Sequence, residues 1–353
     1  MYMTFKMKSI RLTVLMLLIA SFFLLSVSAF ANGQQDSAAP ANGEKKVMKI
    51  NAASMFDEVH PFTQTYYKFE ELVNKYQDEV TIEVKYNLNK SLGIETDYFR
   101  FMSQGESVDL AILAPANIAT RVPSIAIVDM PLLFKDYAHR NRVLASDLFK
   151  AIEEDVVKKA NVRIIGYAGG ASRSIISNYP ITNMEDLQGF KLRVQGAPIW
   201  AKVFDAVGAV PSVIAYDEVY SAIQTGVIQG LENEKIGYAQ MRFFEVAPHY
   251  TLNEHSITVR PLFMSEKAYN KFSPTVQAAI MKAGKEAGEF GAQVELELGQ
   301  IELDKLVKSG LANVHPFSDA DKAEFKARAT PALLKYVEEA GFTELYNGIQ
   351  AIK

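Results

Sequence analysis

The chain of 353 residues contains no cysteine, which excludes disulfides and thiolate metal sites. It has five histidines without metal-type spacing, and no HExxH motif: His60, His139, His249, His255 and His315. A Walker phosphate loop and a G-x-G-x-x-G motif are also absent. The segment nearest to a nucleophile elbow, residues 170–174, has Ser in place of its second glycine, which disfavours a secreted hydrolase. We therefore expect a protein that is not an enzyme and holds neither a metal nor a cofactor.

The N-terminus has the pattern of an export signal. Lys6, Lys8 and Arg11 precede an apolar and small-residue run, 12–31, that carries no charge. The run ends in Ala-Phe-Ala, so we expect residues 1–31 to be a signal peptide that is cleaved after Ala31, and the protein to be periplasmic. The alternative is an uncleaved anchor, because about 20 apolar residues are enough to span a bilayer.

The segment that follows the signal is small and polar, and the rest of the chain is acidic. Residues 32–46 have little to bury, which predicts a flexible leader. Loss of residues 1–31 removes three cations and no acid, so the formal net charge moves from −4 to −7. Such a chain has no general attraction for nucleic acid, and we expect no nucleic-acid partner. No second apolar stretch is long enough to cross a membrane, so we expect a soluble mature protein.

Strand-like and helix-like runs alternate along the chain, which predicts an α/β fold. A first series has strands at 47–52, 80–86, 108–113 and 162–166, with helices at 63–76 and 94–104 between them. After Gly169 and Gly170 a second series begins, with strands at 174–177 and 191–194 and helices at 183–189, 198–207 and 217–225. About 300 residues are too many for one simple core, so the restart indicates two lobes.

One long helix is expected near the C-terminus. Ser273 and Pro274 form an N-cap and a favoured first helical residue, and no proline follows before Ser309. A helix of about 35 residues measures roughly 50 Å, enough to brace both lobes. Its four glycines, at positions 284, 288, 291 and 299, lead us to expect a break or kink.

The most distinctive motifs lie between residues 166 and 233. They read GFKLRV, then GAVP, then EVYSAIQTGVIQGLEN, and a stretch VDMPLLF occurs earlier, at 128–134. In these motifs the chain resembles the substrate-binding proteins of tripartite ATP-independent periplasmic (TRAP) transporters, of the C4-dicarboxylate-binding type. The resemblance extends over roughly residues 47–345 and includes 128–134 as the family's strand-then-proline stretch.

This resemblance implies a two-lobed periplasmic-binding-protein-like α/β fold with hinge strands and a long helix that spans both lobes. We expect lobe I to comprise 47–170 and about 259–298, and lobe II 171–258 and about 299–353. A monomer would capture a small organic-acid anion between the lobes and deliver it to the TRAP membrane permease. The alternatives are the binding protein of an ATP-driven importer and the sensing partner of a chemoreceptor.

The resemblance also assigns ligand-binding residues. The family's main carboxylate-binding arginine falls on Arg193, a second arginine on Arg173, the motif asparagine on Asn233 and a pocket aromatic on Tyr216. A guanidinium presents a rigid fork that matches a carboxylate, which a lysine does not reproduce. The alternatives are a surface loop position for Arg173, a helix cap for Asn233 and a core position for Tyr216.

Weaker candidates bear on the ligand itself. His255 would donate to a bound oxygen or, alternatively, lie satisfied in the interior. Glu95 matches a position where related proteins contact ligand hydroxyls, and Asn117 is a further pocket candidate. Sialic-acid binders carry an acid where this chain reads LAPAN, at 113–117, which disfavours that ligand. A C4-dicarboxylate, a keto or aliphatic acid and a uronic or aldonic acid all remain compatible, and Trp200 fits either the core or the cleft border.

Overall fold

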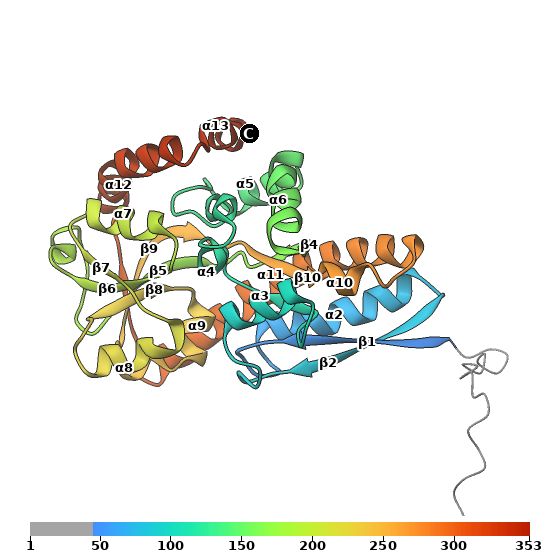
Figure 1. Cartoon of the computed structure of the whole chain (residues 1–353). Coiled ribbons are helices and arrows are strands. Elements are labelled where there is room, and N and C mark those ends of the chain that lie inside the picture. The colour runs from blue at the N-terminus through green and yellow to red at the C-terminus, as the bar shows by residue number, and fades with distance from the viewer. Residues whose placement is uncertain (1–44) are drawn as a thin grey trace, which may run out of the picture. The chain divides into compact units, whose positions relative to one another are not determined.

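The computed structural model describes residues 45–353, which carry two separate β-sheets flanked by helices (Figure 1). The signal peptide expected at 1–31 lies outside the described residues, as does the leader except for its last two residues. Lys46 of that leader already belongs to the first strand, because it pairs with Val80. The α/β class expected from the alternating pattern is confirmed.

The first sheet has the strand order β2-β1-β3-β10-β4. β1 runs parallel to β2 and β3, whereas β10 runs antiparallel to β3 and β4. Its strands are β1 (Lys46–Ala53), β2 (Val80–Asn87), β3 (Leu110–Ile112), β4 (Val162–Ala168) and β10 (Arg260–Ser265). The late strand β10 thus lies in the middle of a sheet otherwise built from the first part of the chain.

The second sheet has the order β11-β9-β5-β8-β6-β7. β6 runs parallel to both of its neighbours, β7 and β8, and β5 runs antiparallel to β8 and β9. Its strands are β5 (Ser172–Ser177), β6 (Lys191–Val194), β7 (Val210–Val213), β8 (Gly230–Asn233), β9 (His249–Ile257) and β11 (Asn313–Pro316). β6 and β8, which contain the motif residues Arg193 and Asn233, are therefore interior neighbours in this sheet.

The helices pack on these sheets and connect their strands. The α-helices are α2 (Pro61–Tyr76), α3 (Glu95–Gln104), α4 (Pro115–Ile118), α5 (Tyr137–Leu144), α6 (Lys150–Ala160), α7 (Pro198–Ala206), α8 (Val219–Gln224), α9 (Lys235–Gln240), α10 (Glu266–Tyr269), α11 (Pro274–Lys308), α12 (Asp319–Glu339) and α13 (Thr343–Ala351). Five short 3₁₀ helices accompany them: η1 (Pro123–Ile127), η2 (Asp147–Phe149), η3 (Glu185–Leu187), η4 (Tyr216–Glu218) and η5 (Phe243–Glu245).

The long helix α11 spans 35 residues, as the sequence predicts, with the Ser273 side chain accepting from the Val276 amide at its N-terminus. It packs against α2 and β4 and, further along, against α9 (Figure 1). The expected break is wrong, because the helix is continuous, whereas the alternative of a kink stays a prediction. Two of its glycines serve packing instead: Gly284 and Gly288 lie directly on the β4 backbone, and a Cβ on Gly288 would be 2.6 Å from the Tyr167 carbonyl oxygen.

Two chain segments besides α11 connect the sheets. β4 leads into β5 through Gly169 and Gly170, both with positive φ, as only glycine adopts readily. β9 leads into β10 through Thr258 and Val259, and the Thr258 amide donates to the Ala171 carbonyl at 3.0 Å, so the two connections are bonded to each other. The sheets are therefore joined by a pair of hydrogen-bonded connecting segments.

The C-terminal helices bridge distant parts of the chain. α12 packs on α7, beside the second sheet. α13 instead reaches residues that follow the first strands, since Gln350 Nε2 donates to the Leu133 carbonyl at 2.7 Å and Lys135 Nζ to the Gln350 carbonyl at 2.8 Å. The expected lobe II thus includes a helix that bonds to the expected lobe I, and the lobe boundaries stay a prediction.

Two local expectations are wrong. The helix expected at 183–189 is only the 3₁₀ turn η3, whose N-cap residue is Met184. The Asn183 side chain, one residue earlier, accepts from the Glu185 amide at 2.8 Å, but Gly189 follows within one turn. The stretch 128–134, expected to contain a strand, follows the 3₁₀ helix η1 and continues as turns. Its Asp129 carboxylate accepts from the Val259 amide and pairs with Arg260, so this segment serves the sheet connection.

Candidate ligand-binding site

A cavity lies between elements of the two sheets, and the empty space in it, part of which is open to solvent, measures about 380 Å³. β5, β6, η4 and β8 contribute residues from the second sheet and its surroundings, and α2, α3, α4 and β10 contribute residues from the first. The lining residues are Phe56, Phe62, Glu95, Ala114, Asn117, Arg173, Arg193, Gln195, Tyr216, Asn233, Glu234 and Arg260. Of the seven candidate residues, six line this cavity, and His255 does not.

Arg193 enters the cavity from β6. Its neighbours Leu192 and Val194 belong to the main hydrophobic core, so strand alternation directs the arginine to the opposite face. The side chain is buried, and its Nε donates to the Ile214 carbonyl at 2.9 Å while the guanidinium lies 5.4 Å from the ring centre of Tyr216. Burial lowers the pKa of Arg193 from its ordinary value, an effect that the charge of Glu232 partly offsets.

The terminal nitrogens of Arg193 are free of protein partners within residues 45–353: its one side-chain hydrogen bond there uses Nε. A buried cation that lacks a carboxylate partner is costly. The arginine therefore holds two parallel donors ready for an anion in the cavity.

Arg173, on β5, differs from Arg193 because its guanidinium is fully bonded to protein groups. Its Nε bonds the Glu232 carboxylate, its Nη1 bonds the Glu234 carboxylate, and its Nη2 donates to the Glu232 carbonyl at 2.7 Å. Burial opposes its charge, but Glu232 and Glu234 outweigh that effect and raise the pKa of Arg173 above its ordinary value. Burial likewise disfavours the charged form of Glu232, but the charge of Arg173 and the hydrogen bonds to this carboxylate outweigh burial and lower the pKa of Glu232 to about 2. Every nitrogen of this guanidinium is thus already bonded to the protein.

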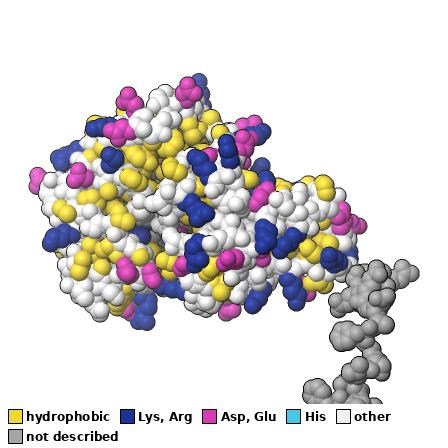
Figure 2. Space-filling view, viewed as in Figure 1, with side chains coloured by type: hydrophobic (Ala, Val, Ile, Leu, Met, Phe, Trp, Pro, Cys, Tyr) yellow, Lys and Arg dark blue, Asp and Glu magenta, His cyan; other side chains and the backbone are white. Residues whose placement is uncertain are grey.

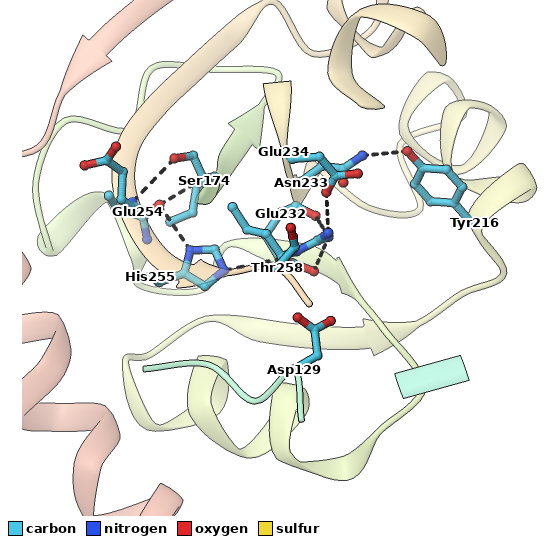
Figure 3. Close-up of polar contacts among 12 residues, drawn as sticks. Asp129, Ser174, Tyr216, Glu232, Asn233, Glu234, Glu254, His255 and Thr258 are labelled. Carbon is cyan, nitrogen blue, oxygen red and sulfur yellow. Dashed lines mark hydrogen bonds and ion pairs between the residues drawn. The ribbon is translucent and has the colours of Figure 1, made fainter. Parts of the chain in front are cut away.

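Asn233 and Tyr216 form a pair at the cavity wall. Asn233 Nδ2 donates to the Tyr216 hydroxyl at 2.6 Å, as Figure 3 shows. Gly237 makes room for the pair, because a Cβ there would be 2.5 Å from Asn233 Nδ2 and 2.8 Å from the tyrosine oxygen. The helix-cap alternative for Asn233 is not what the structure has, since this residue ends β8.

Glu95 and Asn117 meet on the other wall. One oxygen of Glu95, the first residue of α3, accepts from Asn117 Nδ2 at 2.8 Å and from the Ala114 amide at 3.0 Å. Burial raises the pKa of Glu95, and the two hydrogen bonds oppose that shift. Glu95 and Asn117 both line the cavity.

His255, on β9, lies behind the cavity wall. Its Nε2 is 3.3 Å from a Glu232 oxygen, its Nδ1 is 3.3 Å from Asn253 Oδ1, and its side chain is fully buried (Figure 3). Burial lowers its pKa. The interior alternative stated for this histidine is the one that the structure has. Trp200 is likewise fully buried, with the Arg173 guanidinium 5.5 Å from its ring centre.

Besides Ala114, five side chains that the sequence did not predict line the cavity: Phe56, Phe62, Gln195, Glu234 and Arg260. Two had a signal in the sequence, because Gln195 shares a strand face with Arg193, two residues away, and Glu234 follows the motif asparagine. Arg260 pairs with Asp129, 131 residues away, and that partnership has no local pattern.

The charged side chains that line the cavity differ in whether they are already paired within the protein. Arg173 is bonded to two carboxylates and Arg260 to one, which leaves Arg193 as the arginine with open donors. Glu95 and Glu234 add acceptor oxygens. On the outer face seen in Figure 2, by contrast, basic and acidic side chains are interspersed. The cavity therefore combines the open guanidinium donors of Arg193 with carboxylate acceptor oxygens.

Within residues 45–353, no cluster of three or more acidic or histidine side chains is arranged to hold a metal ion. The same part of the chain has no helix with the length and apolarity that a membrane span requires.

Two sheets joined by paired strands and a long helix, with a polar cavity between their elements, define an extracytoplasmic solute-binding protein. The sequence pattern of the bacterial extracellular solute-binding proteins of family 7 matches residues 52–340. The chain belongs to this family, which comprises the periplasmic solute-binding proteins of TRAP transporters.

Relatives and solved structures agree with this assignment. A solute-binding protein of Sulfitobacter sp. strain NAS-14.1 is 45% identical over 303 residues, which cover 86% of this chain and 91% of that protein. A TRAP periplasmic solute binding protein from the same strain, solved with bound alpha-D-taluronate, matches with a TM-score of 0.80 and 43% identity, covering 86% of this chain and 97% of that one. One from Roseobacter denitrificans OCh 114, solved with L-galactonate, has a TM-score of 0.77 and 28% identity, over 87% of this chain and all of that one.

Proposed function

We propose that this chain binds one sugar acid, uronic or aldonic, in the cavity and delivers it to the permease of a TRAP transporter. Arg193 is the observation that carries the proposal, because its terminal nitrogens are buried at the cavity and bonded to no other described residue. A guanidinium in this state binds a carboxylate through two parallel, charge-assisted hydrogen bonds.

The rest of the lining favours a sugar acid over a C4-dicarboxylate. A second ligand carboxylate would meet Glu95 and Glu234, since the other two lining arginines are already paired with carboxylates. Hydroxyl groups, in contrast, donate well to such oxygens. The similar proteins solved with taluronate and galactonate support the same class.

We propose that the two sheets belong to two lobes that close on the ligand, with the sheet connections as hinges. Two contacts cross the expected cleft: a Cβ on Gly196 would be 3.3 Å from the Ala116 carbonyl oxygen, and Lys90 Nζ is 4.0 Å from the Asp217 carboxylate. Ligand favours closure only through contacts that are better in the closed state, and residues from both walls supply them.

The proposed function requires that the protein reach the periplasm. We propose that residues 1–31 are removed after Ala31, so that the mature chain begins at Asn32 in the periplasm. Mass spectrometry of the exported chain tests this directly; a mass that still includes the first 31 residues contradicts it.

A thermal-shift panel tests the ligand class. The panel contains D-galacturonate, D-glucuronate, L-galactonate, succinate and, as a control without a carboxylate, D-galactose. A sugar acid at 100 times its Kd should stabilise the protein by about 2.7 kcal/mol, seen as a rise in Tm. Succinate and galactose should give no shift. Stabilisation by succinate without any by the sugar acids would reject the proposal in favour of a dicarboxylate.

A further inference from the structure

Gln195 is a buried polar side chain without a partner for its amide nitrogen. Within residues 45–353, six buried side-chain polar atoms lack a hydrogen-bond partner, and Gln195 Nε2 is the one among them that belongs to a cavity-lining residue. The side chain is 2% exposed. A buried N–H donor without an acceptor destabilises the fold. At a binding cavity, an acceptor on a bound ligand would satisfy such a donor.

The position of Gln195 places it beside the carboxylate clamp. It follows β6 directly, two residues after Arg193, and strand alternation brings both side chains to the same face. β6 is paired with β7 and β8 on either side, and Gly196, which follows Gln195, lies so near the Ala116 carbonyl that an added Cβ would be 3.3 Å from its oxygen. The backbone of Gln195 is therefore positioned by the paired strand before it and by this close approach after it.

We infer that Gln195 is a specificity-determining residue, whose Nε2 donates to the ligand oxygen next to the carboxylate that Arg193 binds. This inference rests on the proposed function. In the ring form of a uronic acid that oxygen is the ring oxygen, which has lone pairs and no proton, and in an aldonic acid it is the α-hydroxyl. Succinate has a methylene group at this place. Gln195 thus selects acids that carry an oxygen on the carbon next to the carboxylate.

The chemistry of the donor explains why an amide suits this place. An amide NH₂ group donates without adding charge, so it leaves the match between one cation and one carboxylate undisturbed. A site built to donate to a ligand oxygen rejects an analogue that lacks it, because the donor is then left unpaired.

The test compares two variants with two ligands by isothermal titration calorimetry. The variants are Gln195→Leu and Gln195→Glu, with the exposed Gln293→Leu on α11 as the control. The ligands are D-glucuronate, or another uronate that the wild type binds more tightly, and its carbocyclic analogue, in which CH₂ replaces the ring oxygen.

For the uronate, Gln195→Leu should raise Kd about 10-fold, the usual effect of losing one uncharged hydrogen bond. Gln195→Glu should raise it on the order of 100-fold or more, because a second anion then faces the ligand carboxylate. For the carbocyclic analogue, the wild type and Gln195→Leu should bind equally. The Tm of unliganded Gln195→Leu should equal or exceed that of the wild type, because the orphan donor is gone, and Gln293→Leu should change nothing.

Two outcomes overturn the inference: unchanged uronate affinity in Gln195→Leu, or an equal loss for both ligands, which would mean a structural role. Either leaves the proposed function standing. If instead the wild type binds no sugar acid at all, the proposed function fails, and this inference fails with it.

Discussion

Arg173 and Arg193 both reach the cavity, yet only one of them is free to bind an anion. Arg173 is enclosed by the carboxylates of Glu232 and Glu234, whereas Arg193 gives one nitrogen to a carbonyl and keeps two. We therefore assign Arg173 to positioning Glu234 and to balancing its charge, and Arg193 to the ligand. In this assignment the two arginines have separate consequences when they are replaced.

Replacement of Arg193 tests the clamp. Arg193→Ala should weaken sugar-acid binding by 100-fold or more, roughly the effect of losing a buried charged hydrogen-bond pair, while the unliganded Tm stays nearly unchanged. Arg193→Lys should also bind poorly, because one ammonium does not reproduce the fork. Ligand-dependent thermal shifts measure both, with Arg328→Ala on the exposed face of α12 as a control. Full ligand stabilisation of the Ala variant, or wild-type affinity in the Lys variant, would refute the bidentate clamp.

For single residues, the sequence predicts which side chains line the cavity better than it predicts their hydrogen-bond and ion-pair partners. Arg193 and Asn233 meet at one cavity because they lie on the neighbouring strands β6 and β8, and Tyr216 joins them from η4, which follows β7. The motif does not predict that Arg173 is bonded by Glu232, since β5 and β8 meet only through antiparallel pairing. That pairing also encloses His255, whose direct ligand contact the geometry does not favour.

The long helix α11 depends on its glycines for contact with β4. Gly288→Ala would force a Cβ to within 2.6 Å of the Tyr167 carbonyl oxygen, so the helix or the strand must shift. Such overpacking costs about 1–3 kcal/mol, and we expect the unliganded Tm to fall by several degrees. Gly299→Ala is the matched control on the same helix, because its Cβ would be 3.3 Å from a lysine side chain. Alanine is a better helix former than glycine, so helix propensity alone predicts no loss in either variant. An equal loss in both variants would contradict a specific role of the strand contact.

Among the elements, those with clear end signals are predicted well and those without are not. Ser273, Pro274 and the absence of later prolines give the extent of α11. Its glycines predict a break or kink from the sequence alone, because their packing against β4, more than a hundred residues earlier in the chain, is a tertiary contact that no local pattern shows. The Asn183 side chain accepts from the Glu185 amide at the start of η3, yet the tertiary fold stops this helix after one turn.

Across the whole molecule, buried charges gather where the two sheets are joined. Glu295, on α11, is 2% exposed; Thr258 donates to one of its oxygens at 3.4 Å, and the other oxygen has no partner within residues 45–353. Burial, aided by the charge of Glu234, raises the pKa of Glu295 to about 7, although Arg260 and Arg140 oppose the shift. The carboxyl of a sheet connection is thus held near its titration point at neutral pH.

This arrangement makes stability depend on pH in a defined direction. The pKa of Glu295 in the folded protein lies above its ordinary value of 4.5. The contribution of this carboxyl to stability is therefore complete below about pH 4.5 and is lost as the pH rises through 7. As the pH rises from 5 to 8, the free energy of unfolding of Glu295→Gln should therefore increase relative to that of the wild type, by up to about 3 kcal/mol. Urea unfolding across this range measures the difference. Glu289→Gln, exposed on the same helix, should show no such trend; a flat difference for Glu295→Gln as well would contradict the protonated state.

The single tryptophan of the chain gives the molecule an optical property. Trp200 is fully buried, and the guanidinium that holds Glu234 at the cavity lies 5.5 Å from the centre of its ring. All indole emission from the protein therefore originates one side chain away from the cavity, at a buried ring. We expect ligand binding to change this emission in the unlabelled wild-type chain, without a background from any other indole.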